Sequence, residues 1–198
     1  MLKNKNAALP FNKPKSIAVI GSYSVIGPKG ANGFVDRGGN DGTLAMGWGS
    51  GSVEFPYLIA PLDAIKAQAQ KDGTSISSSP NDNAQQGASA AQNADVAVVC
   101  INSDGGEGYI TVEGVAGESS DMVCLLRPLT KRPILPGANT NTTIGDRNNL
   151  DPWHNGNELV KAVAAVNKKT IVVVHSVGPV IMEQWIDNPN VVAVVWAG

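Results

Sequence analysis

The chain has 198 residues, of which 42% are hydrophobic and 16% are charged, and its formal net charge is −2. This length suits one ordinary domain with a real hydrophobic core, and the weak charge argues against a nucleic-acid surface. The apolar runs are too short to span a membrane, and two cysteines with two histidines are too few for a disulfide framework or a metal-ligand cluster.

Predicted strands and helices alternate through the first half of the chain. Residues 16–21 read as a short buried strand that ends at a glycine, and a long glycine-rich loop is expected over 22–55. Residues 56–71 are predicted to form a helix, because a proline stands at its start and apolar residues line one face. A weak strand over 74–78 and an Ala/Gln-rich helix over 83–94 follow.

The second half continues the alternation. An apolar strand is predicted over 95–102, and an amphipathic helix over 157–167. A buried strand over 170–175, a short helix over 180–187 and a last strand over 191–196 complete the chain. Because the strands are almost continuously apolar and alternate with helices, the fold class is predicted to be α/β, with a mostly parallel sheet sandwiched by helices.

The whole chain, 1–198, is predicted to be one α/β domain that is truncated at its C-terminal end, since it stops directly after a strand without a closing helix. In such sheets, ligands bind beyond the carboxyl ends of the strands. Gly21, the 103–109 loop and the 175–178 loop all fall at those ends. The sequence therefore predicts the functional edge there.

The stretch INSDGGEGYI, residues 101–110, places Glu107 between Gly106 and Gly108 just beyond a buried strand. Flanking glycines allow a positive φ or a close approach to a ligand, so Glu107 is a candidate general acid if partial burial raises its pKa. A solvated loop acid is the commoner interpretation of such a residue. Asp104 is a second candidate acid, or alternatively a residue that caps a turn. The glycines on both sides favour Glu107 over Asp104.

Two aromatic residues are candidate ligand contacts. Tyr109 could form a stacking wall for a sugar, or it could be a half-buried strand residue. Trp48 stands among glycines in GTLAMGWGSG, an arrangement typical of sugar sites and equally of a loop anchor. His175 is expected to satisfy a hydrogen bond at a strand end, and Cys100 is expected to be inert in a strand core.

Other chemical motifs fail, so no cofactor is expected. The stretch from Gly21 to Gly27 follows a strand, but Tyr23 occupies the place of the second glycine of a dinucleotide fingerprint. Neither a phosphate-binding GxxxxGK[ST] loop nor a GxSxG nucleophile elbow occurs.

Four long motifs in order resemble fungal β-glucosidases of glycoside hydrolase family 3. They are NDGTLAMGWGSGSVEFPY (40–57), SDGGEGYITVEG (103–114), GDRNNLDPWHNG (145–156) and HSVGPVIMEQWIDNPNVVAVVWAG (175–198). The resemblance covers nearly the whole chain except 118–144. It implies a barrel domain of the (β/α)8 type followed by an α/β sandwich domain, with the active site between them, and this chain resembles the sandwich domain.

The resemblance also assigns roles and overturns the solvated-acid interpretation of Glu107. Glu107 matches the family's acid/base residue, within a loop formed by Gly106, Gly108 and Tyr109, and Tyr109 lines the aglycone side. Trp48 is the remaining candidate for substrate binding.

The implied reaction is hydrolysis of terminal β-D-glucosyl residues, as in cellobiose and other β-glucosides, with retention. The family's nucleophile is an Asp in a Ser-Asp-Trp-like motif of the barrel domain, and this chain has no such motif. The expectation is therefore a secreted-type enzyme whose preceding barrel domain is the partner. The chain alone, which shows no signal peptide, is expected to be inactive. The alternative is a non-catalytic sugar-binding or domain-docking module.

Residues 118–144 do not fit the α/β pattern, because they contain three prolines and no clean period. By resemblance, Gly117 and Gly145 correspond to one glycine. The codons for Gly117-Glu118-Ser119 can spell an intron start, and those for Ile144-Gly145 an intron end. One hypothesis is a retained intron; the alternative is a true surface loop, which the sequon at Asn141 supports.

Overall fold

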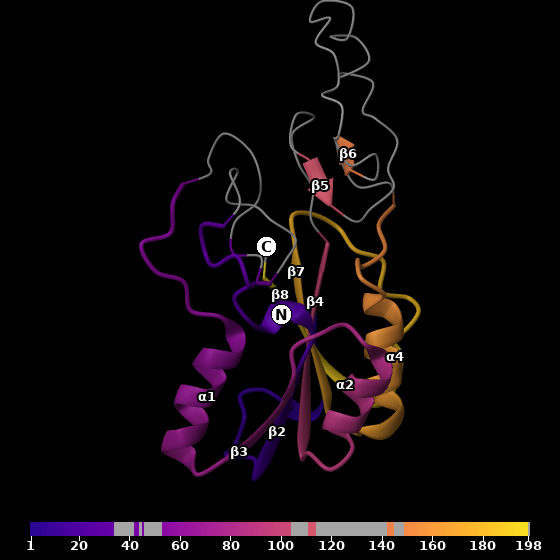
Figure 1. Cartoon of the computed structure of the whole chain (residues 1–198). Coiled ribbons are helices and arrows are strands. Elements are labelled where there is room, and N and C mark those ends of the chain that lie inside the picture. Colours follow the sequence, from indigo (N-terminus) through magenta and orange to yellow (C-terminus); the bar gives the residue numbers. More distant parts are fainter. Residues whose placement is uncertain are drawn as a thin grey trace, which may run out of the picture.

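The computed structural model describes residues 1–33, 42–43, 45, 53–103, 111–113, 142–144 and 149–197, and only the backbone over 111–113 and 142–144. A six-stranded sheet forms its centre, in the order β1-β8-β7-β4-β2-β3 (Figure 1). The strands are β1 Lys3–Asn4, β2 Ser16–Ile20, β3 Ser75–Ser79, β4 Val96–Ser103, β7 Thr170–Ser176 and β8 Val191–Ala197. All neighbours pair in parallel except β1 with β8, so the predicted fold class is confirmed.

Helices cover both faces of the sheet. Figure 1 shows α1 (Pro61–Asp72) on one side and α2 (Ala84–Ala91) with α4 (Gly156–Val166) on the other. Asn83 caps α2, since its side-chain oxygen accepts a hydrogen bond from the Gln86 N–H at 3.0 Å. The predicted arrangement, a sheet covered by helices on both faces, is therefore observed.

Two apolar clusters, one on each face, form the core, and β4 contributes to both. All eight residues of β4 are buried. Ala97, Val99 and Ile101 pack with α2 and α4, whereas Val96, Val98 and Cys100 pack on the α1 side. Burying an aliphatic side chain of this size stabilises a fold by about 1.5–3 kcal/mol, so the doubly covered strand is a major source of stability.

Helix α1 begins later than predicted. The structure starts it at Pro61, not Pro56, and Ala60 has extended backbone angles (φ −74°, ψ 156°). A residue before proline is disfavoured in the helical region, whereas proline itself suits the first helical position. The second proline, rather than the first, therefore sets the start.

The short helix predicted over 180–187 is wrong, because the segment forms turns. Met182 accepts hydrogen bonds at its carbonyl from the N–H groups of Trp185 (3.0 Å) and Ile186 (2.8 Å), which makes one isolated turn. Prolines bound the segment on both sides, and short helices are marginal without neighbouring turns. Buried Trp185 anchors the segment instead, donating its indole N–H to Asn157 Oδ1 at 2.8 Å.

The sequence did not indicate three short strands. β1 runs antiparallel along β8 at the sheet edge. β5 (Thr111–Glu113) and β6 (Thr142–Ile144) pair as a separate antiparallel ribbon. The last residues of the predicted irregular stretch are thus extended and paired. The rest of 118–144 lies outside the described residues, so the intron interpretation stays a hypothesis.

Gly21, the residue after β2, has a backbone conformation that few other residues adopt, with φ +103°. A Cβ atom there would lie 2.1 Å from the Cys100 carbonyl oxygen in β4. We predict that Gly21→Ala lowers the free energy of unfolding by about 2–4 kcal/mol, because strain and a backbone collision add together. The shift of the urea midpoint at constant slope measures this loss.

Gly73→Ala provides the matched control. Gly73 also has a positive φ, +73°, but a methyl group added there would meet no atom within 4 Å. Its loss should be about 1 kcal/mol, from conformation alone. Equal losses for the two variants would contradict the role given to the close approach between β2 and β4.

Candidate functional site

The carboxyl ends of β4 and β7 form a fixed rim. Ser103, the last residue of β4, pairs in register with Ser176 of β7. The Ser103 carbonyl accepts a hydrogen bond from the Val177 N–H at 3.3 Å, and the Asn102 carbonyl accepts one from the Trp153 N–H at 2.9 Å. The chain that follows Ser103 therefore starts from a point held by the sheet and by the segment before α4.

The candidate residues from the sequence lie outside the described residues: Trp48, Asp104, Gly106, Glu107, Gly108 and Tyr109. Their roles remain predictions. In the structure, β4 ends at Ser103, immediately before the 104–110 stretch. This stretch therefore begins at the carboxyl end of a parallel strand, where ligands bind in such sheets.

A carboxylate that sequence reasoning missed ties two turns together at the same edge. Asp82 accepts hydrogen bonds from the Ser22 N–H (3.0 Å) and the Ser22 hydroxyl (2.6 Å). The Gly21 N–H donates to the Ser79 carbonyl at 2.9 Å. The turn after β2 is thereby held to the turn after β3. No sequence pattern signals this pair, because its partners are sixty positions apart.

An aromatic cluster lies where β2 ends and α4 begins. The His154 ring is 5.8 Å from the Tyr23 ring and 6.2 Å from the Trp153 ring, measured between centroids. His154 and Asn155 both have left-handed backbone angles, with φ of 52° and 60°. Such strain in non-glycine residues clusters at functional sites. This cluster is therefore an addition to the candidates found from the sequence.

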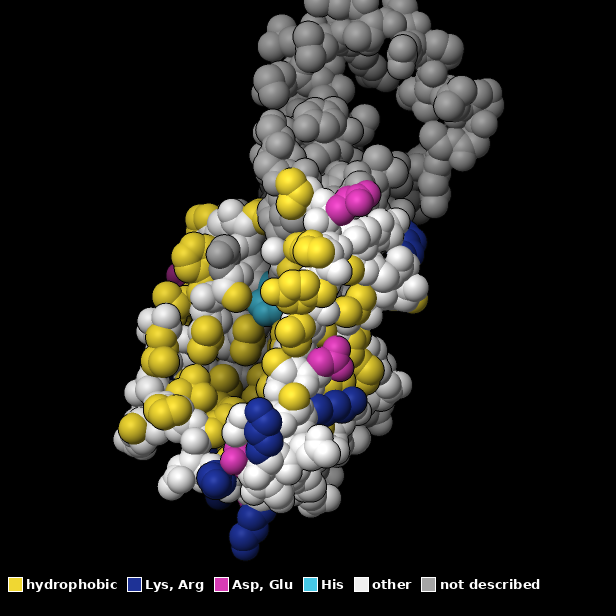
Figure 2. All heavy atoms as spheres, turned by 90° about the vertical axis from the view of Figure 1, so that its left-hand side faces the viewer, with side chains coloured by type: hydrophobic (Ala, Val, Ile, Leu, Met, Phe, Trp, Pro, Cys, Tyr) yellow, Lys and Arg dark blue, Asp and Glu magenta, His cyan; other side chains and the backbone are white. Residues whose placement is uncertain are grey.

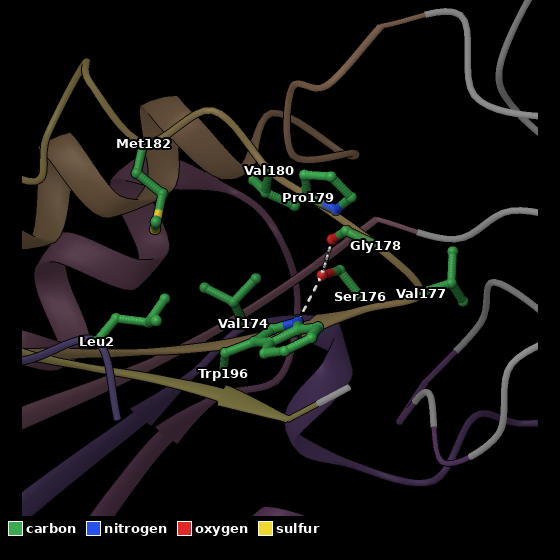
Figure 3. Close-up of a pocket in the computed structure, with 9 residues that line it drawn as sticks. All are labelled: Leu2, Val174, Ser176, Val177, Gly178, Pro179, Val180, Met182 and Trp196. Atoms are coloured by element: carbon green, nitrogen blue, oxygen red, sulfur yellow. Dashed lines mark hydrogen bonds between the residues drawn. The ribbon is translucent and has the colours of Figure 1, made fainter.

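A pocket of about 400 Å³ opens at the ends of β7 and β8 (Figure 3). Val174, Met182 and the half-exposed indole of Trp196 form apolar walls. The indole N–H donates to the Ser176 hydroxyl (2.9 Å), which donates to the Gly178 carbonyl (2.7 Å). Since these polar groups already bind one another, the pocket offers mainly an apolar contact surface.

The α1 side of the molecule exposes further apolar side chains. Figure 2 views this side and shows hydrophobic side chains gathered around a hollow. Val53, Tyr57 and Ile59, which precede α1, are 63%, 75% and 64% exposed. Exposed apolar side chains that gather in this way are typical of a surface that another domain or protein covers.

Two buried titratable groups flank the rim. Cys100 is fully buried in β4, as predicted, and burial raises the pKa of its thiol to about 12, with a further contribution from the Asp82 charge. Burial lowers the pKa of His175. Its Nδ1 is buried without a hydrogen-bond partner among the described residues, so the expected satisfied hydrogen bond is wrong for this atom. Backbone groups beside it are used in the ladders to β4 and β8.

Within the described ranges, no group of three or more His, Cys, Asp or Glu residues could hold a metal ion. No described helix combines the length and apolarity that crossing a membrane requires.

The burial of His175 leads us to expect that stability depends on pH. In the unfolded chain a histidine takes up a proton near pH 6.5, but folded His175 does so only at lower pH. The stability that the neutral His175 ring contributes is therefore present above about pH 6.5 and is lost as the pH falls below that value toward the lower pKa of the folded state. We predict that His175→Gln loses less stability than the wild type between about pH 7.5 and 5.5.

Urea unfolding at both pH values measures this difference, and His154→Gln, at an exposed histidine, is the control. An identical pH dependence in the wild type and His175→Gln would show that the buried ring does not contribute.

Comparisons with known proteins match the chain over its full length. The family model described as "Glycosyl hydrolase family 3 C-terminal domain" matches residues 1–198. "Probable beta-glucosidase L" of Aspergillus terreus is 55% identical over 198 residues, which are 100% of this chain and 23% of that protein.

Solved structures agree. Beta-glucosidase D2-BGL from Chaetomella raphigera superposes with a TM-score of 0.82 at 46% identity, and 24% of that chain is covered. Beta-D-glucoside glucohydrolase from Trichoderma reesei gives 0.79 at 49%, with the same coverage. Both comparisons cover 100% of this chain, which spans about a quarter of its relatives' length. The chain belongs to the glycosyl hydrolase family 3 C-terminal domain family.

Proposed function

We propose that this chain supplies the acid/base half of a retaining β-glucosidase active site, with Glu107 as the acid/base residue. The observation that carries the proposal is the family match over the whole chain, together with a β4 strand that ends at the sheet rim just before the 104–110 stretch. The similar proteins are themselves named as β-glucosidases.

The reaction needs two carboxylates about 5–5.5 Å apart, and the second would be an Asp of a preceding barrel domain. This Asp attacks the anomeric carbon while Glu107 protonates the departing glycosidic oxygen. Glu107 then removes a proton from water, which attacks the glycosyl-enzyme and releases glucose with the original configuration. Tyr109 lines the aglycone side and Trp48 is a further substrate contact, and no cofactor is required.

The preceding domain is also the proposed occupant of the apolar surface beside α1. Val53, Tyr57 and Ile59 support this assignment, because their exposure leaves apolar area that a neighbouring domain would remove from water. The relatives are about four times longer than this chain, which leaves ample length for such a domain. The complete protein would act outside the cell on small β-glucosides.

Glu107→Gln in the protein that includes the barrel domain tests the role of the acid. We predict that kcat/KM for cellobiose falls by about 10²–10⁴-fold, the usual contribution of a general acid. An aryl β-glucoside with an acidic leaving group should lose less, and azide should rescue Glu107→Ala by forming β-glucosyl azide. Asp104→Asn is the matched control, and an effect confined to Asp104 would transfer the role to that residue.

The isolated 198-residue chain should not turn over an aryl β-glucoside, because it lacks the nucleophile. Robust turnover by the purified chain would refute the division of the active site. Glucose binding that survives Glu107→Ala, with no activity gained from the barrel domain added in trans, would instead support the non-catalytic module.

A further inference from the structure

A second pocket, of about 660 Å³, lies at the opposite end of the sheet, where the parallel strands begin. Lys15 and Asp95 precede β2 and β4, and Lys168 and Lys169 precede β7. Lys5 enters from the 3-10 turn η1 (Lys5–Ala7). The lower end of the face in Figure 2 likewise carries mainly lysines among its coloured charged side chains.

The charge of this pocket is unbalanced. Four lysines line it, and Asp95 is the only acidic residue among its described lining. The Oδ2 atom of Asp95 already accepts hydrogen bonds from the backbone N–H groups of Lys15 (2.8 Å) and Ser16 (3.3 Å). In the described part of the chain, none of the four ammonium groups has an ion pair. A concave surface with an excess of one charge sign concentrates ions of the opposite sign, although the whole chain has net charge −2.

The wall that carries Lys5 is rigidly built. The Asn4 side chain donates to the Leu9 carbonyl at 2.9 Å and accepts from the Leu9 N–H at 3.0 Å, which closes the loop between them. Asn6 and Ala7 inside this loop have left-handed backbone angles, with φ of 53° and 50°. Such conformations persist only where surrounding contacts enforce them, so the backbone that carries Lys5 is held in place at the pocket edge.

The same pocket also has apolar lining, to which Phe11, Ile171 and Val192 contribute. Its volume falls within the range of about 300–1,000 Å³ that is typical of small-molecule sites and is generous for one inorganic phosphate. Lysine ammonium groups bind oxyanions as point charges, and an apolar wall accepts a ring or hydrocarbon body. We propose that this pocket binds a ligand with phosphate or sulfate groups on a ring body.

Naphthalene-1,5-disulfonate provides a probe with two anionic groups on one ring system. Calorimetric titration of the chain at low ionic strength should give saturable binding that is tighter than for naphthalene-1-sulfonate or inorganic phosphate. Lys5→Ala/Lys168→Ala should bind the probe at least about tenfold more weakly, because two of the four charges are removed. Lys66→Ala/Lys71→Ala, which removes two exposed charges from α1, should bind it like the wild type.

Unchanged circular dichroism and Tm for both double variants would show that the fold is kept. A parallel comparison of 1-naphthyl phosphate with 1-naphthyl sulfate would separate phosphate esters from sulfate esters, according to which binds more tightly. Absence of saturable binding to the wild type, or equal weakening in the two double variants, would overturn the proposal.

Discussion

Complete burial of β4 between two helical layers is the constraint on which the rest of the molecule depends. Its side chains alternate between the α1 layer and the α2/α4 layer, and each layer needs the strand to close its core. Its backbone pairs with β2 on one side and β7 on the other. The position of Ser103 is therefore set by packing along the whole strand, and so is the starting point of the 104–110 stretch.

The sheet gives the two ends of the molecule different chemistry. At the carboxyl ends, Asp82 joins two turns and the rings of Tyr23 and His154 approach each other. At the amino ends, lysines from three separated segments converge on one pocket. Both arrangements arise because parallel strands bring all their beginnings to one edge and all their ends to the other, and the antiparallel β1 brings Lys5 to the edge where they begin.

The fold could be predicted from the sequence wherever strand patterns were strong. The apolar runs that became β2, β4, β7 and β8 were recognised because strands buried on both faces have few polar residues. Prediction failed at Pro56 and over 180–187, where the local pattern permitted a helix but proline geometry and the buried Trp185 prevented one. β1 was missed because a two-residue edge strand has no periodicity to detect.

The candidate site was less predictable than the fold. Glycines around Glu107 indicated a loop acid, but only the family resemblance favoured catalysis over a solvated residue. The pair of Ser22 with Asp82 depends on two turns meeting in space, so no spacing along the chain signals it. The lysine pocket likewise depends on distant segments. Sequence patterns report local periodicity, whereas these features are products of the assembled sheet.

The buried thiol of Cys100 gives the molecule an internal reporter. At its high pKa the thiolate is scarce in the native state, and the side chain has no exposed area. Alkylating reagents can therefore reach this sulfur only when the central strand detaches from its neighbours. The chain has one other cysteine, Cys124. With Cys124 replaced by serine, the rate of alkylation would follow the opening of the middle of the sheet.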